Sequence, residues 1–184
     1  LIYGGTHSNE LAGEMMAVML MENVKCEAGT LYVIVHANNS GVSHTTPLRA
    51  QHGSVEFTLA DGSTRTIRIG SRLSNPVDSW PDPNYRMANS GRELKHDECA
   101  ELRNLNRNHP GVKDGYLTEQ ICYAIYNMVS TENINLVYDG HEAGAEGNPN
   151  RLANLIVSHD RGLAVGANAA LTAMLDEGIP LKSE

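Results

Sequence analysis

A continuous run of five apolar residues at positions 31–35, Leu-Tyr-Val-Ile-Val, constrains the fold of this chain more than any other feature. Such a run is typical of a strand that other elements cover on both faces, as in parallel sheets. Short apolar runs alternate with stretches of helical pattern: the runs lie at residues 1–3, 31–35, 134–138 and 152–158, and the helical stretches at 9–22, 93–102, 117–129 and 163–175. The alternation predicts an α/β fold with a mixed, largely parallel central sheet flanked by helices.

Residues 54–69 interrupt this alternation. Segments 55–59 and 64–69 each alternate apolar and polar side chains with a period of two, and Asp61-Gly62 lies between them. The pattern predicts an antiparallel hairpin with one exposed face, inserted into the main fold. Because no linker or composition shift is visible, we expect residues 1–184 to form a single catalytic-type domain that contains this insertion.

The amino-acid composition limits the kinds of molecule that this protein is expected to bind. The chain has 14 Lys and Arg against 22 Asp and Glu, a formal charge of −8, which argues against nucleic acid or an anionic membrane as partner. We find no apolar run long enough to span a membrane. The three cysteines form no C-x-x-C pair, so we expect no disulfide framework and favour a cytoplasmic location. The chain begins within a strand pattern and ends as another starts, so we expect both ends to be truncated.

Potential metal ligands follow the first apolar run. His7 and Glu10 form an H-x-x-E pair after the glycine pair Gly4-Gly5, where a helical pattern begins. Two ligands at this spacing can face one point when a helix starts beneath them. An imidazole and a carboxylate are two thirds of the His2Glu set that holds a catalytic zinc, so the pair predicts a distant third ligand.

His141 is the best candidate for that ligand. It follows the apolar run 134–138, and ligands of open α/β sheets bind beyond the carboxyl ends of the strands. We therefore predict one Zn²⁺ per chain, held by His7, Glu10 and His141. Asp139 either orients His141 or caps the strand end, and Glu142 and Glu146 are candidates for the same orienting role. The alternative is that these are ordinary loop and core residues without a metal.

Arginines supply candidates for binding an anionic substrate. Asn106 and Arg107 lie side by side in an Asn-rich segment that ends at Pro110-Gly111, and an arginine can hold a carboxylate through two parallel hydrogen bonds. Arg72 is a candidate for polarising a carbonyl group. Three further arginines compete with it for that role: Arg86, Arg92 and Arg103.

Three motifs together resemble the zinc carboxypeptidase superfamily, and most closely its succinylglutamate desuccinylase/aspartoacylase family. The motifs are Gly-Gly-Thr-His7-Ser-Asn-Glu10, Asn-Leu-Asn106-Arg107 and Asp139-Gly-His141. Ser8, Asn104 and Gly140 replace a glycine, an aspartate and a leucine of the family pattern. The resemblance covers about residues 1–160.

The resemblance implies a zinc exopeptidase-like fold with His7, Glu10 and His141 as zinc ligands. It implies that Asn106 and Arg107 grip a substrate carboxylate, and that the protein is a zinc-dependent hydrolase of an amide bond next to that carboxylate. An N-acyl amino acid is the preferred substrate class. The family's general base is a glutamate well downstream of the third ligand, and we find no residue for it in this chain.

Two other functions remain open at this stage. A metallocarboxypeptidase that acts on peptide C-termini would use the same zinc and arginine arrangement. The missing base favours a different class, a metal-binding module that is catalytically incomplete. We expect a small-molecule or peptide carboxylate as partner in the first two cases.

Overall fold

The fold is described from a computed structural model, which describes residues 1–43, 53–79, 100–142, 172 and 176. The chain divides into two compact units, Leu1–His141 and Glu142–Glu184. All elements named below belong to the first unit. In the second, Thr172 and Asp176 are helical and exposed, while the strand predicted at residues 152–158 lies outside the described residues.

A parallel sheet of three strands, ordered β2-β1-β5, forms the centre of the first unit. The strands are short: β1 spans Ile2–Gly4, β2 spans Val33–Ile34 and β5 spans Tyr138–Gly140. Ile2 of the middle strand lies opposite both Val33 and Tyr138, so all three strands point the same way. Their carboxyl ends therefore meet at one edge of the sheet.

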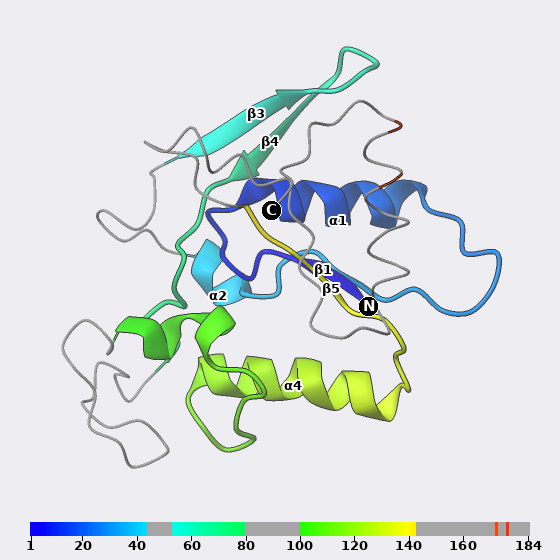
Figure 1. Ribbon diagram of the computed structural model, residues 1–184. Helices are drawn as coiled ribbons and strands as arrows, with labels where there is room; N and C mark the ends of the chain where they lie inside the picture. The colour runs from blue at the N-terminus through cyan, green and yellow to red at the C-terminus, as the bar shows by residue number, and fades with distance from the viewer. Residues whose placement is uncertain (44–52, 80–99, 143–171, 173–175, 177–184) are drawn as a thin grey trace. The chain divides into compact units, whose positions relative to one another are not determined.

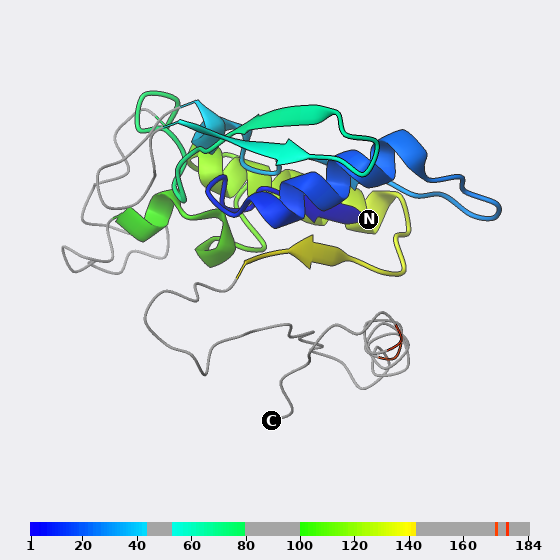
Figure 2. The same ribbon diagram turned by 90° about the horizontal axis from the view of Figure 1, so that it is seen from above.

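Two helices cover opposite faces of this sheet, as Figures 1 and 2 show from two directions. Helix α1 spans Leu11–Asn23, and helix α4 spans Leu117–Thr131. Glycines let α1 lie directly on the strands, because a Cβ at Gly13 would collide with the carbonyl of Gly140. At the start of α4 the Glu119 carboxylate accepts a hydrogen bond of 2.8 Å from the Tyr116 amide. The predicted α/β layer with a parallel sheet between helices is confirmed.

The hydrophobic core of the first unit joins β1 to α4. It contains six buried residues: Leu1, Tyr3, Ala37, Leu105, Cys122 and Ile125. Burial raises the pKa of the Cys122 thiol to about 12, so this cysteine acts as an apolar side chain. Cys26 and Cys122 are free thiols, as expected, while Cys99 lies outside the described residues.

The predicted hairpin is present. Strand β3 (Ser54–Thr58) pairs antiparallel with β4 (Thr64–Arg68), and exposed residues alternate with half-buried ones along both strands. Arg65 of β4 donates a 2.7 Å hydrogen bond to Glu22 at the end of α1, so the hairpin lies against this helix. Figure 1 shows the hairpin beyond α1, on the side of the helix away from the sheet.

Several predicted strand boundaries are wrong. The run 134–138 was expected to be the strand, yet β5 begins only at Tyr138, because its ladder to β1 joins residues 138–140 to residues 2–4. The run 31–35 was expected to be covered on both faces. Only Val33 and Ile34 of this run are in a strand, and both are half-buried, because β2 is an outer strand of the described sheet.

Two helical segments also differ from expectation. No helix was expected directly after the run 31–35, yet a short helix α2 (Asn39–Val42) lies there, and Asn38 caps it by accepting a hydrogen bond from the Gly41 amide. Of the helix predicted at residues 93–102, residues 93–99 lie outside the described part, and Ala100–Arg103 form a 3₁₀ turn, η1. A second 3₁₀ turn, η2 (Leu105–Arg107), follows directly. Within the part of the chain that the structure describes, no helix is long and apolar enough to cross a membrane.

Candidate metal centre

His7, Glu10 and His141 meet at the carboxyl edge of the sheet. His7 lies in the loop after β1, Glu10 directly precedes α1, and His141 directly follows β5. Gly5 starts the loop with a φ of +70°, a left-handed conformation that favours glycine and turns the chain sharply out of the strand. The predicted placement of two histidines beyond two strand ends is confirmed.

The three side chains turn their ligand atoms toward one another. These atoms all lie within 4.8 Å of each other. One carboxylate oxygen of Glu10 is 2.6 Å from His7 Nδ1, and the other is 2.8 Å from His141 Nδ1. The two imidazole rings lie 5.0 Å apart at an interplanar angle of 61°. The arrangement presents two nitrogens and a carboxylate to one point, and this group could hold a metal ion.

The outer nitrogen of each imidazole has its own partner. His7 Nε2 is 2.9 Å from Oδ1 of Asn104, and His141 Nε2 is 2.9 Å from Oδ2 of Asp139. The second oxygen of Asp139 accepts a 2.8 Å hydrogen bond from the Thr6 hydroxyl. Oxygen partners of this kind fix the ring orientation and leave Nδ1 as the metal-binding nitrogen. Of the two roles considered for Asp139, the structure supports orientation of His141.

Charge and burial differ between the two histidines. His7 is only 2% exposed, while the His141 side chain is 30% exposed. Hydrogen bonds to the Asp139 and Glu10 carboxylates raise the pKa of His141 to about 9, so in the absence of a metal its imidazolium is the dominant form at neutral pH. A metal ion would replace that proton.

Arg72 is the cation beside this group. Its Nη1 lies 3.2 Å from His7 Nδ1 and 3.6 Å from the Glu10 carboxylate. The segment after the hairpin delivers it there, since the Gly70 amide donates to the Ser8 carbonyl and the Ser8 amide donates to the Ser71 carbonyl. The structure thus places the Arg72 guanidinium beside His7 and Glu10.

In the described part of the chain, Asn106 and Arg107 make no direct contact with the side chains of His7, Glu10 or His141. Both are exposed, and among the described residues the guanidinium of Arg107 contacts the Asn106 carbonyl and, at 3.8 Å, the Glu101 carboxylate. Arg103 is buried and donates to the Ser74 carbonyl. Hence Arg72 is the predicted arginine that the described structure brings to the group. Arg86, Arg92 and Glu146 lie outside the described residues.

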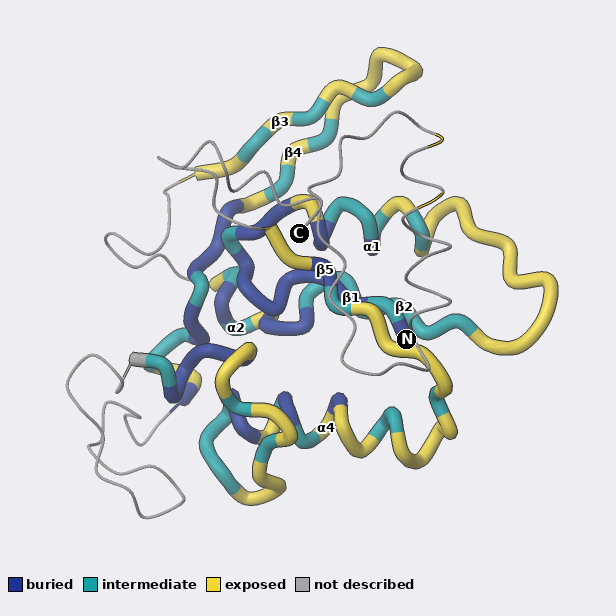
Figure 3. Tube along the Cα trace, viewed as in Figure 1, coloured by how far each residue is buried: buried dark blue, intermediate teal, exposed yellow. Residues whose placement is uncertain are grey.

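Sequence reasoning missed Asn104 and the buried polar layer around it. Figure 3 shows deep burial around the loops beside α2. There, Ser8 donates to the Asn38 carbonyl, and a chain of hydroxyls runs from Thr118 of α4 through Ser74 to the Asn38 side chain. These groups fix the loops that carry His7 and Arg72. The only sequence signal for Asn104 was its place at the head of the Asn-Leu-Asn-Arg motif.

The donor set fits a tetrahedral metal. Ligands at zinc distances of about 2.0–2.1 Å lie roughly 3.3 Å from one another. The contacts of 2.6 and 2.8 Å between Glu10 and the two histidines are shorter than this, so these side chains would have to move apart to admit an ion.

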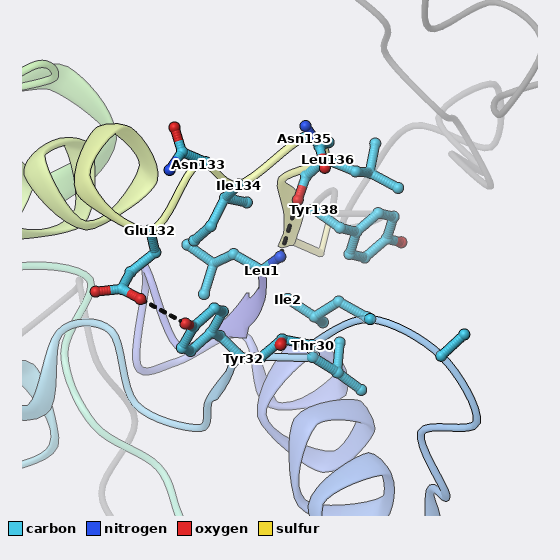
Figure 4. A pocket seen from close by; sticks show the side chains of 13 residues that line it. Leu1, Ile2, Thr30, Tyr32, Glu132, Asn133, Ile134, Asn135, Leu136 and Tyr138 are labelled. Carbon is cyan, nitrogen blue, oxygen red and sulfur yellow. Dashed lines mark hydrogen bonds between the residues drawn. The ribbon is translucent and has the colours of Figure 1, made fainter.

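A separate cavity of about 590 Å³ lies at the opposite, amino end of the strands. Figure 4 shows apolar side chains such as Leu1, Ile134 and Leu136 around it. Its polar contacts are structural: Tyr32 donates to Glu132, and the Leu1 amino group donates to the Leu136 carbonyl. The polar groups of this cavity therefore offer no counterpart to the group formed by His7, Glu10 and His141.

Comparisons of the chain with protein-family models, with curated proteins and with solved structures give no match. Function is therefore inferred from the residues and geometry described above.

Proposed function

We propose that this chain is a zinc-dependent hydrolase that cleaves an amide bond next to a carboxylate, with an N-acyl amino acid as the substrate class. The observation that carries the proposal is the convergence of His7, Glu10 and His141 within one coordination sphere, from two separate strand ends. The motif resemblance to succinylglutamate desuccinylases and aspartoacylases supports the choice of reaction. On this proposal the α/β layer is a zinc exopeptidase-like fold.

Zinc is the metal that this donor set suits best. Two imidazole nitrogens and one carboxylate are typical of catalytic zinc sites, whereas calcium and magnesium prefer all-oxygen sets. Bound zinc supplies a Lewis acid that polarises a carbonyl oxygen and activates water. The partly exposed His141 leaves a route for a substrate to approach the group.

The surrounding residues have distinct roles in this proposal. Asn104 and Asp139 hold the two imidazoles in orientation through their outer nitrogens. Arg72 binds an anionic oxygen of the substrate, because its guanidinium lies beside the ligands while carrying a positive charge. Arg107 remains the candidate for a more distant carboxylate.

Metal content is the first test. Protein loaded with zinc and then desalted should retain one zinc per chain, and anomalous scattering should place it between the three side chains. His7→Ala and His141→Ala should each lose that zinc. A wild-type protein that retains none, with unaltered stability after chelation, would rule out the metal centre.

Substrate class is the second test. The zinc-loaded protein should release the acyl group from N-acetylaspartate or N-succinylglutamate faster than it cleaves the C-terminal residue of a peptide. Arg72→Met and Arg107→Met each replace one arginine by the same uncharged side chain, so their effects can be compared directly. Arg72→Met should lower kcat/KM by about 100-fold, the order expected for a lost charge-assisted contact to the reacting group. If neither substrate type is turned over by any preparation, the protein binds metal without this chemistry.

A further inference from the structure

The orientation of the Asn104 amide is fixed by two unambiguous neighbours. Asn104 is fully buried and precedes η2. Its Oδ1 accepts from the Asn106 backbone N–H at 3.0 Å, and its Nδ2 donates to a carboxylate oxygen of Glu101 at 2.5 Å. A backbone N–H can only donate, and an ionised carboxylate can only accept, so the amide has one allowed orientation.

This orientation also fixes the tautomer of His7. Because Asn104 presents its oxygen to Nε2, at 2.9 Å, that nitrogen must carry the hydrogen. On the other side of the ring, Nδ1 lies 2.6 Å from the Glu10 carboxylate and 3.2 Å from Arg72 Nη1. Since Nε2 carries a hydrogen, Nδ1 is the nitrogen that can offer a lone pair to a metal ion.

We infer that Glu101 is a positioning residue for the metal ligand His7, acting through the Asn104 amide. The inference rests on the metal centre of the proposed function and adds a residue that neither binds the metal nor touches His7. Glu101 accepts a hydrogen bond from the Asn104 nitrogen, and this contact turns the Asn104 oxygen toward His7. The oxygen in turn accepts from Nε2 of His7 and so leaves Nδ1 facing the metal position. The side chain of Glu101 is 32% exposed, so the residue can be substituted without opening the core.

The same contacts couple the identities of residues 101 and 104. An aspartate at position 104 could accept from His7, but its second oxygen would face the Glu101 carboxylate at the distance of the present hydrogen bond. Two carboxylates this close repel one another or share a proton. An aspartate at 104 therefore requires a neutral donor at 101, which a glutamine amide provides.

The test uses zinc alone as probe, with its dissociation constant measured by competition with a chromophoric chelator at one pH. Glu101→Gln should bind within about threefold of wild type, because the glutamine carbonyl can still accept from Asn104. Asn104→Asp should weaken zinc binding by about 10–100-fold, the range for lost outer-shell partners. The double variant Glu101→Gln/Asn104→Asp should recover most of that loss. Asn135→Asp, an exposed change at the other end of the sheet, is the matched control.

A second variant keeps the inference testable if Asn104→Asp does not fold. Glu101→Leu removes the acceptor and frees the Asn104 amide to turn, so it should weaken zinc binding about tenfold while Glu101→Gln does not. Nitrogen NMR of the imidazoles should report a hydrogen on Nε2 of His7 in the wild type and a mixture of tautomers in metal-free Glu101→Leu.

Two outcomes would overturn the inference while leaving the metal centre intact. One is a wild type that binds zinc together with a double variant no better than Asn104→Asp. The other is a Glu101→Leu variant with wild-type affinity and a wild-type tautomer. A wild type that binds no zinc would instead count against the proposed function itself.

Discussion

At the scale of single residues, the two histidines of the metal group face partners of different charge. His141 lies between the Asp139 and Glu10 carboxylates, whereas the outer partner of His7 is the neutral amide of Asn104. The carboxylates favour the charged form of His141, so metal binding must displace a proton from this residue before the site can fill.

Zinc affinity should therefore depend on pH through His141. Because its pKa is raised to about 9, apparent affinity should rise roughly tenfold per pH unit from pH 7 and level off near pH 9. Chelator competition at several pH values checks this. Asp139→Asn removes the largest cause of the raised pKa, so its profile should level off at lower pH. A wild-type affinity that is flat between pH 7 and 9 would contradict the charge assignment.

A second prediction for single residues concerns the backbone conformation of Gly5. Its φ of +70° disfavours any other residue, and a Cβ there would also lie 2.8 Å from the Glu14 carboxylate. Gly29 has a similar φ of +76° but nothing within 4 Å of a Cβ. Gly29→Ala should cost about 1 kcal/mol of unfolding free energy for the backbone alone, and Gly5→Ala about 3 kcal/mol. Urea unfolding measures the free energy of unfolding of both variants. Equal losses of stability would show that the contact with Glu14 does not contribute to the cost at Gly5.

Residue types and strand placement predicted the convergence of His7, Glu10 and His141 but not the residues around them. His7 and His141 could be placed because the carboxyl ends of parallel strands share an edge, and Glu10 because of its spacing from His7. The choice of Arg72 over Arg107 could not be made, since it depends on how the segment after the hairpin pairs with Ser8. Asn104 stood out only as the head of the Asn-Leu-Asn-Arg motif, because its role comes from a contact 97 residues away in sequence.

At the scale of elements, α1 is joined to the loop after β2 by an ion pair in which only the carboxylate is buried. Glu14 of α1 is fully buried, and its carboxylate lies 3.3 Å from His36 Nδ1. Among the described residues, neither Glu14 oxygen has a well-aligned hydrogen bond. When His36 is protonated, its imidazolium supplies the compensating charge for a carboxylate that water does not reach.

This pair should make stability depend on pH. The Glu14 carboxylate raises the pKa of His36 above its ordinary 6.5. The stabilisation is then complete below pH 6.5 and is lost as pH rises through the raised value. His36→Gln should cost about 2 kcal/mol at pH 6, where Glu14 loses its partner, and less at higher pH. Urea unfolding across this range checks the trend, and Glu14→Gln/His36→Gln should recover part of the loss. If the stability lost in His36→Gln instead grows with pH, protonated His36 is not the partner that stabilises Glu14.

Element types could be predicted from periodicity, whereas their ends were set by tertiary pairing. The hairpin boundaries were correct to within one residue, because β3 and β4 pair with each other and their turn is local. The strands of the parallel sheet pair across long sequence separations, so β5 was placed too early and β2 too long. No local pattern in the apolar run 134–138 marks the residue at which pairing with β1 begins.

At the scale of the whole molecule, the metal group joins the start of the first unit to its end. His7 and Glu10 come from the loop between β1 and α1, and His141 comes 131 residues after Glu10. In the absence of metal, the link between these segments at the site consists of hydrogen bonds from both histidines to one carboxylate. A bound ion would replace them with coordination bonds to all three side chains, and it would bind the folded state only.

Zinc should consequently stabilise the folded protein by mass action. At a free concentration 100 times the dissociation constant, the gain is roughly 2.7 kcal/mol, which corresponds to a rise in Tm of about 5–10 °C for a chain of this size. His141→Ala should abolish the rise, whereas His109→Ala, a histidine outside the group, should keep it. Thermal unfolding with zinc and with a chelator measures the difference. Because the unfolded chain lacks the converged ligands, a shift of equal size in His141→Ala would mean that zinc binds somewhere other than the carboxyl edge of the sheet.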